Sequence, residues 1–170
     1  MKQFILGGAR SGKSHHAQQL AEASGKSVIY IATATAGDEE MQQRILMHQQ
    51  QRPQHWRLIE EPIKLSEMLL QNDNVEHCLL VDCLTLWLSN CLAMDDEKFV
   101  EQQQRELINT ISKLKSDLLL VSNEVGQGIV PMNELARKFV DESGRMHQLL
   151  AQTCDRVIFL TAGLAQILKS

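Results

Sequence analysis

The amino-acid sequence predicts an α/β protein with a mostly parallel central sheet flanked by helices. Short apolar runs alternate along the chain with longer segments of helical periodicity. The apolar runs are nearly continuous rather than alternating, which is typical of strands buried on both faces of a parallel sheet. Repeated strand–helix–strand order then calls for right-handed crossover connections. Five such runs and one shorter candidate are the predicted strands: 3–6, 27–33, 78–82, 117–122 and 156–161, with the shorter strand inside 55–60.

Helical segments are predicted between these strands. A glycine in 24–26 ends the first helix, and Pro53 ends the second near Gln51 because proline disfavours the helical region in the residue before it. Asn133 is the expected N-cap of the last helix. The predicted helices cover 13–23, 37–51, 62–71, 96–115 and 133–153.

The segment 84–93, "LTLWLSNCLA", is almost uniformly apolar. Two interpretations fit this composition: a helix buried in the core of the chain, or a face that packs against another subunit.

The composition is that of a soluble, single-domain chain. The 170 residues suit one domain, 1–170, with a sizeable core. A net charge of −4 and a pI near 5.9 argue against a nucleic-acid partner, because such proteins usually carry a basic excess. No apolar run approaches the roughly 18 residues of a membrane span. The chain enters a glycine-rich loop at once, which leaves no room for a cleavable signal peptide.

The four cysteines form no CxxC pair and lie mostly in apolar runs. We interpret them as reduced core residues of a cytoplasmic protein. They are Cys78, Cys83, Cys91 and Cys154.

The stretch "GGARSGKS" at 7–14 fits the phosphate-loop pattern G-x-x-x-x-G-K-[ST], with a strand before it and a helix after it. Glycines let several backbone N–H groups turn toward one anion, and the helix N-terminus adds its positive end. Lys13 supplies a full charge to the outer phosphates, and the Ser14 hydroxyl suits Mg²⁺. The predicted nucleotide contacts of the loop are Gly7, Gly8, Ala9, Arg10, Ser11, Gly12, Lys13 and Ser14.

A carboxylate is also expected near the metal. Asp82 follows four apolar residues in "CLLVD", the pattern of a Walker B strand. Ser14 and Asp82 are therefore the predicted metal ligands. The chain is expected to bind a nucleoside triphosphate and Mg²⁺, which leaves kinase, NTPase, nucleotidyltransferase and switch as open classes.

His48 stands in "RILMHQQQRP", residues 44–53. In the predicted second helix, Glu40, Arg44 and His48 share one face at i, i+4 and i+8. A solvated helix face explains this pattern, and so does a catalytic face in which arginines bind phosphate oxygens through a planar fork. A neutral imidazole is a competent nucleophile near pH 7. By contrast, His77 and His147 carry no functional signal in the sequence.

Several stretches together resemble one enzyme family. They are "GGARSGKS", "YIATA", "DEEMQQRILMHQQQRPQHWRLIEEP", "VDCLTLWLSN", "SNEVGQGIVPMNELARKFVDESGRMHQ" and a final "AG". The chain is similar, over nearly its whole length, to the bifunctional adenosylcobinamide kinase / adenosylcobinamide-phosphate guanylyltransferase family of cobalamin biosynthesis.

The resemblance implies a RecA-like P-loop NTPase fold and two reactions. The first phosphorylates adenosylcobinamide with ATP or GTP, and the second transfers GMP from GTP to the product through a guanylyl-histidine intermediate. His48 matches the family's covalent histidine, with Lys13 as the second catalytic residue. The implied nucleotide site joins residues 7–14 with Ala32, Thr33, Ala34, Gln49, Gln50, Gln51, Arg52, Glu60 and Asp82.

The same resemblance implies a corrinoid substrate and a homotrimer with shared active sites, beside the Mg²⁺ expected from the phosphate-loop pattern and the absence of a nucleic-acid partner expected from the net charge. Two other classes compete with this interpretation: a P-loop small-molecule kinase without a covalent step, and a non-catalytic nucleotide-binding module. In both, His48 would be dispensable.

Overall fold

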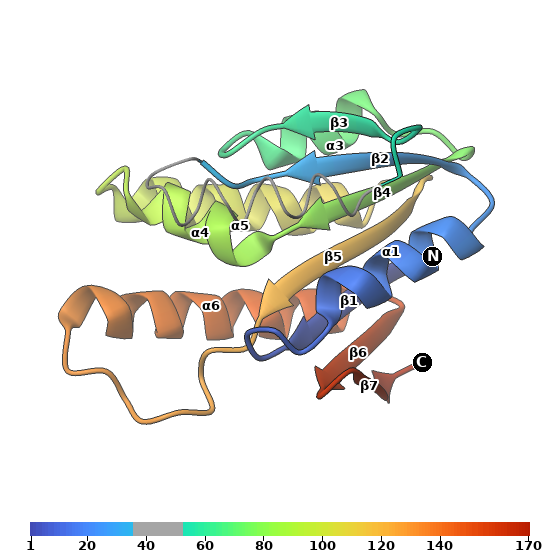
Figure 1. The fold of residues 1–170 in the computed structure, drawn as a ribbon. Helices are drawn as coiled ribbons and strands as arrows, with labels where there is room; N and C mark the ends of the chain where they lie inside the picture. Colours follow the sequence, from blue (N-terminus) through green and yellow to red (C-terminus); the bar gives the residue numbers. More distant parts are fainter. Residues whose placement is uncertain (36–52) are drawn as a thin grey trace.

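A computed structural model describes residues 1–35 and 53–170. The described chain forms one seven-stranded sheet with helices on both faces (Figure 1). In chain order the elements are β1 (Lys2–Gly7), α1 (Lys13–Ala23), β2 (Ser27–Ala32), β3 (Arg57–Glu60), α3 (Leu65–Gln71), β4 (His77–Asp82), α4 (Leu84–Leu92), α5 (Glu97–Ile111), β5 (Asp117–Asn123), α6 (Glu134–Thr153), β6 (Arg156–Thr161) and β7 (Leu164–Lys169).

The strand order is β3-β2-β4-β5-β1-β6-β7, and β1 to β6 are parallel. This confirms the predicted α/β class with a mostly parallel sheet. Because the strands are parallel, the segments that follow β1, β2, β3, β4 and β5 all leave the sheet at one edge, here called the carboxyl edge.

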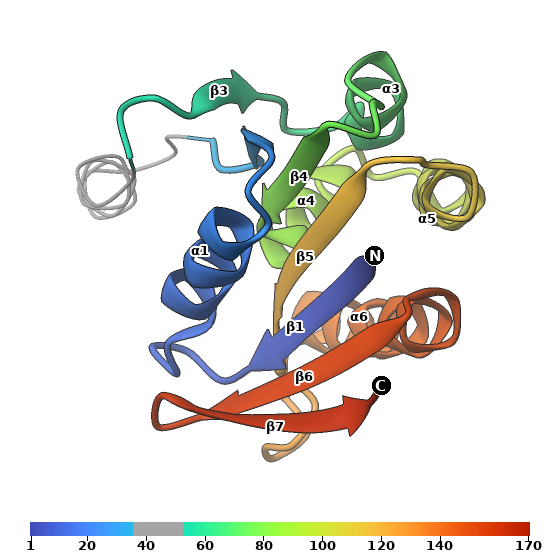
Figure 2. The same cartoon turned by 90° about the vertical axis from the view of Figure 1, so that its right-hand side faces the viewer.

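The two faces of the sheet carry different helices (Figure 2). Helix α1 covers one face, where Ala17 and Ala21 pack against side chains such as Ile5 and Val121. Helices α3, α4, α5 and α6 cover the other face, where Trp87 and Leu107 are fully buried. Each central strand contributes side chains to both cores, which explains why its sequence is apolar without alternation.

The segment 84–93 forms helix α4, and its apolar residues enter the core of the same chain. Leu84, Trp87, Leu88 and Cys91 have no exposed surface. The Trp87 indole N–H also finds an acceptor, the carbonyl of Ile63 at 2.8 Å. The interpretation as a buried helix is confirmed for these residues.

Most predicted helices are found with small shifts in their ends. Asp96 caps α5 through its side chain, which accepts hydrogen bonds from the N–H groups of Lys98 and Phe99. Asn133 caps α6 as predicted, accepting from the Ala136 N–H at 3.0 Å. The prediction that a helix begins at residue 62 was wrong.

Helix α3 begins instead at Leu65. The Glu61 carboxylate holds a turn before it by accepting from the N–H groups of Ile63 at 2.9 Å and Lys64 at 2.7 Å. The helix predicted over 37–51 lies outside the described residues.

The C-terminal hairpin was not predicted. Strand β7 runs antiparallel to β6 after a turn at Ala162 and Gly163, which have φ angles of 51° and 80°. Two successive positive φ angles are the geometry of a tight hairpin turn. Lys169 fixes the hairpin to the end of α6, because its ammonium donates to the carbonyls of Ala151, Gln152 and Cys154.

The four cysteines are free thiols, and three of them are buried as predicted: Cys78, Cys91 and Cys154. Burial raises the pKa of Cys91 and of Cys154 to about 12, so both thiols stay protonated at neutral pH. Cys83 is half-buried at the carboxyl edge.

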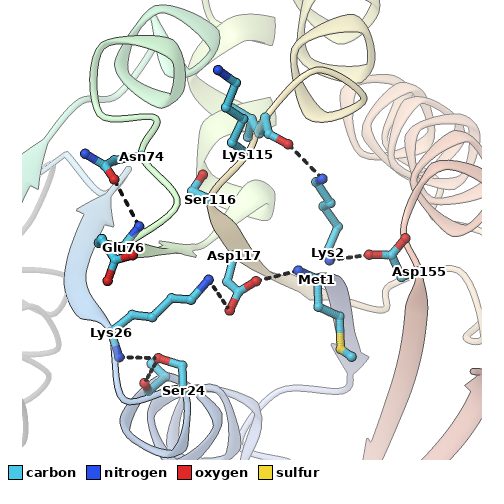
Figure 3. Close-up of polar contacts among 12 residues, drawn as sticks. Met1, Lys2, Ser24, Lys26, Asn74, Glu76, Lys115, Ser116, Asp117 and Asp155 are labelled. Atoms are coloured by element: carbon cyan, nitrogen blue, oxygen red, sulfur yellow. Dashed lines mark hydrogen bonds and ion pairs between the residues drawn. The ribbon is translucent and has the colours of Figure 1, made fainter.

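A polar network closes the opposite edge of the sheet (Figure 3). Asp117, at the start of β5, pairs with the N-terminal ammonium of Met1 and, at 3.0 Å, with Lys26. Burial alone would raise the pKa of Asp117, but hydrogen bonds and charges from these two ammonium groups outweigh burial and lower it. The Lys2 ammonium donates to the carbonyl of Leu114 at 2.8 Å.

Candidate active site

The phosphate loop joins β1 to α1 at the carboxyl edge. Gly12 is the N-cap of α1 and has a φ of 97°, a left-handed conformation that favours glycine. Gly7 lies so close to β6 that a Cβ atom there would stand 2.4 Å from the carbonyl oxygen of Leu160. The loop is also held from the hairpin turn, since the Gly163 N–H donates to the Ser11 carbonyl at 3.0 Å. These contacts preform the backbone cradle that the motif predicts.

Lys13 is folded against the loop that carries it. Only 6% of the residue is exposed, and its ammonium donates to the Gly8 carbonyl at 2.7 Å. Burial lowers the pKa of Lys13, while the negative charge of Asp82 acts in the opposite direction. Lys13 and Asp82 thus lie at the same carboxyl edge, after β1 and at the end of β4, with β5 between these two strands.

Asp82 is the last residue of β4, and its carboxylate accepts a hydrogen bond of 3.0 Å from the Tyr30 hydroxyl. The predicted contacts on the other strands stand in register with it. Ala32 on β2 pairs with Asp82 on one side and with Glu60 on the other. Strand β5 separates β4 from the loop strand β1. The described site residues from four segments thus lie along one edge.

The stretch 32–34 contains one residue with a structural task. Thr33 is fully buried, and its hydroxyl donates to the Cys83 carbonyl at 2.6 Å and accepts from the Cys83 N–H at 3.0 Å. Asn90 holds the same segment, donating to the carbonyls of Thr33 at 2.8 Å and Pro62 at 3.1 Å. The Thr33 side chain therefore links the residues that follow β2 and β4 by hydrogen bonds. Its neighbours Ala32 and Ala34 are both half-buried and thus nearer the surface.

The second group of predicted residues lies outside the described residues. It comprises Glu40, Arg44, His48, Gln49, Gln50, Gln51 and Arg52. The chain leaves β2 for this segment at the carboxyl edge, directly after Thr33 and Ala34. Glu60, which ends β3, is exposed at the same edge.

Sequence reasoning missed a buried polar cluster beside the loop. His147 on α6 is 8% exposed, and its Nε2 lies 2.8 Å from the Ser122 Oγ and 3.3 Å from the Ser143 Oγ. Its Nδ1 lies 3.8 Å from a carboxylate oxygen of Glu124. Ser143 and His147 are four residues apart on one helix, so the sequence could predict that they share a face of it. Their contact with Ser122 on β5 depends on the fold and could not be predicted from the sequence.

The fold and the loop define the class as a RecA-like P-loop nucleotide-binding protein. Similar solved structures include the RadB recombinase, with a TM-score of 0.56 and 15% identity over 93% of this chain and 73% of that one. The flagellar accessory protein FlaH of Methanocaldococcus jannaschii has a TM-score of 0.55 and 16% identity over 99% of this chain and 77% of its own. At such low identity these likenesses support the fold alone.

The sequence comparisons identify the family. The family model "Cobinamide kinase / cobinamide phosphate guanyltransferase" matches residues 3–168, and the chain belongs to this family. Its activities are those of a bifunctional adenosylcobinamide kinase and cobinamide-phosphate guanylyltransferase of cobalamin biosynthesis.

Two curated relatives are similar over almost their whole length. The bifunctional adenosylcobalamin biosynthesis protein CobP of Pseudomonas aeruginosa is 50% identical over 169 residues, 99% of this chain and 98% of the relative. CobU of Escherichia coli is 36% identical over 181 aligned positions, 98% of each chain. Within residues 1–35 and 53–170, no helix has the length and apolarity needed to cross a membrane.

Proposed function

We propose that one nucleotide site serves both reactions and that His48 carries the GMP between them. The phosphate loop and Asp82 at the same carboxyl edge of the sheet support the first half of this proposal. One phosphate-binding loop can serve both reactions, because each reaction breaks a bond in the triphosphate chain of the nucleotide. The family resemblance of "RILMHQQQRP" supports the second half.

In the kinase reaction the corrinoid's hydroxyl oxygen attacks the γ-phosphorus of ATP or GTP. The bond from the γ-phosphorus to the bridging oxygen breaks, and the nucleoside diphosphate leaves. Lys13 and the loop N–H groups hold the charge that develops on the phosphate oxygens. The nucleotide contacts proposed beyond 7–14 are Ala32, Thr33, Ala34, Gln49, Gln50, Gln51, Arg52, Glu60 and Asp82. Thr33 is fully buried and its hydroxyl is engaged with Cys83, so its contribution would be to position its neighbours Ala32 and Ala34.

In the transfer reaction a ring nitrogen of His48 attacks the α-phosphorus of GTP, and pyrophosphate leaves. The phosphate of the corrinoid product then attacks the same phosphorus and breaks the P–N bond. Pyrophosphate is the anion that the loop and Lys13 are built to stabilise. Splitting the transfer in two lets one pocket admit GTP first and the bulky corrinoid phosphate second.

Ser14 and Asp82 fit a magnesium ion by their chemistry. A hydroxyl and a carboxylate are hard oxygen ligands, and Mg²⁺ commonly uses one or two such side chains with nucleotide phosphates. Asp82 is held for this task by the Tyr30 hydroxyl at 3.0 Å. When bound, the ion would neutralise charge on the bridging phosphate oxygens.

The assembly is proposed to be a cytoplasmic homotrimer with shared active sites. Support comes from the loop between β5 and α6, in which Ile129 and Met132 are each 97% exposed. Large apolar side chains that project this far are typical of a surface that another molecule covers. Light scattering during size-exclusion chromatography would give a mass of three chains if the proposal is right and of one chain if it is wrong.

One labelling experiment separates the proposed mechanism from its competitors. The protein is incubated with GTP labelled at the α- or the γ-phosphate, then denatured and freed of nucleotide. The proposal predicts α-label on the protein, acid-labile and base-stable as for a phosphoramidate, and no γ-label. A simple kinase or a non-catalytic nucleotide-binding module would retain neither label.

A further inference from the structure

The kinase step needs a group that takes the proton of the attacking hydroxyl. Among the residues that the structure describes, the candidates at the carboxyl edge are Glu60, Glu61, Asp82 and Glu124, and Glu60 is exposed at the end of β3. Asp82 is engaged with Tyr30 and is a proposed metal ligand. One carboxylate oxygen of Glu61 already accepts two main-chain hydrogen bonds in the turn before α3. Glu124 is different, because it lies beside the phosphate loop and faces a buried polar cluster.

The position of Glu124 is fixed by the strand order. It directly follows β5, the strand between the loop strand β1 and the Asp82 strand β4. Its main-chain N–H donates to the carbonyl of Gly7 at 2.9 Å, at the point where the phosphate loop begins. From there the connection to α6 extends away from the sheet (Figure 1). Glu124 thus lies between the loop and Asp82, where the outer phosphates would be bound.

One oxygen of the Glu124 carboxylate is held by a hydrogen bond, and the other faces a histidine ring. One oxygen accepts from the Gly126 N–H at 2.5 Å, and the other lies 3.8 Å from Nδ1 of His147. Only 20% of the Glu124 side chain is exposed. It is therefore sheltered and directed, yet still reachable from the edge of the site.

His147 is itself locked by its surroundings. Its Nε2 faces the hydroxyls of Ser122 at 2.8 Å and Ser143 at 3.3 Å, and its ring lies 5.4 Å from that of Phe4 between centroids. Burial lowers the pKa of His147, with the Glu124 carboxylate acting in the opposite direction. If Nε2 of a neutral ring accepts from a serine, Nδ1 carries the hydrogen and faces the Glu124 carboxylate at 3.8 Å, a polar contact longer than a hydrogen bond.

We propose that Glu124 is the general base of the kinase step and that His147 is the residue that positions it. In this step the substrate hydroxyl gives its proton to the Glu124 carboxylate as its oxygen bonds to the γ-phosphorus. The bond from that phosphorus to the bridging oxygen breaks, and the diphosphate leaves with the electron pair. The proposal rests on the family's kinase activity. The GMP transfer has no use for this base, because a phosphate attacks in place of a hydroxyl.

The test is the pair of activities in Glu124→Gln, an isosteric change that keeps an acceptor for the Gly126 N–H. Loss of a general base commonly costs about 10²- to 10⁴-fold in rate. We expect the kinase kcat to fall by at least about 100-fold, with the KM for ATP unchanged and α-label transfer from GTP retained. The matched control is Glu134→Gln, at the exposed start of α6, which should leave both activities unchanged.

The positioning role of His147 is tested by comparing the kinase kcat of two variants, because a purely structural role would not make the kcat depend on a side-chain donor. His147→Gln, which keeps a side-chain donor, should lower the kinase kcat less than His147→Ala, and neither should change the KM for ATP. Thermal unfolding identifies any variant that fails to fold, in which case Glu124→Gln decides alone. Equal losses of both activities in Glu124→Gln, or a kinase kcat within about threefold of wild type, would overturn the proposal.

Discussion

The Tyr30 hydroxyl donates a hydrogen bond of 3.0 Å to Oδ2 of Asp82, from strand β2 to its neighbour β4. Tyr30 is 5% exposed, so its ring is held by the core while its hydroxyl reaches the carboxyl edge. The contact fixes one oxygen of the carboxylate on which metal binding is proposed to depend. A tyrosine held in the core thus sets the direction of that carboxylate.

Tyr30→Phe should raise the magnesium concentration needed for half-maximal activity by several-fold while leaving the fold intact. The substitution removes only the donor, and a hydrogen bond to a charged group contributes about 1.5–3 kcal/mol. Activity measured over a magnesium titration checks this expectation. A requirement equal to or below that of wild type would show that the tyrosine does not orient Asp82.

Lys13→Ala should impair kinase and GMP transfer together, each by at least about 100-fold, because both reactions need their phosphate charge held. The matched control is Lys113→Ala, an exposed lysine after α5. Both rates are measured with purified variants at saturating nucleotide. Two rates that stay within about twofold of wild type would contradict a shared phosphate loop.

Asn90→Ala should lower the free energy of unfolding by about 1–3 kcal/mol, because the carbonyls of Thr33 and Pro62 lose a shared donor. Chemical denaturation measures the change. Asn109→Ala, on the exposed side of α5, serves as the control and should be near neutral. An Asn90 variant as stable as that control would mean that the tie between the two segments contributes little.

Asp117→Asn should lower stability at neutral pH by an amount on the order of 1 kcal/mol, as for a half-buried ion pair. The folded-state pKa of Asp117 lies below its ordinary value of 3.8. Its contribution is therefore fully present above about pH 4 and is lost as pH falls through the folded pKa. Denaturation curves of both proteins should differ at pH 7 and converge at acid pH. A constant difference would argue against an electrostatic origin.

Much of the fold could be predicted from the sequence because its signals are local. Runs such as "CLLVD" and "DLLLVS" could be predicted as strands because each is apolar on both faces. The glycine spacing within 7–14 predicts the phosphate loop from the sequence of that segment alone. The N-cap at Asn133 needs only a side chain and the next turn. Because parallel strands share their carboxyl edge, the sequence could also place Lys13 and Asp82 at one edge of the sheet.

The parts that sequence reasoning missed depend on distant contacts. Strand β7 is wholly exposed, so it lacks the apolar run that marked the others, and its pairing depends on the turn at Ala162. His147 is one polar residue on an amphipathic helix. Its role emerges only when the fold brings it to Ser122 and Glu124, which are far away along the chain. A buried polar cluster gives no periodic pattern from which it could be predicted.

The most direct test of the account locates the covalent GMP. Wild type, His48→Ala and the control His55→Ala are incubated with α-labelled GTP, and labelled peptides are identified by mass spectrometry under basic conditions. The account predicts GMP on the peptide containing His48 in wild type and in His55→Ala, and no label in His48→Ala, which still phosphorylates the corrinoid. Label retained by the His48→Ala protein would contradict it.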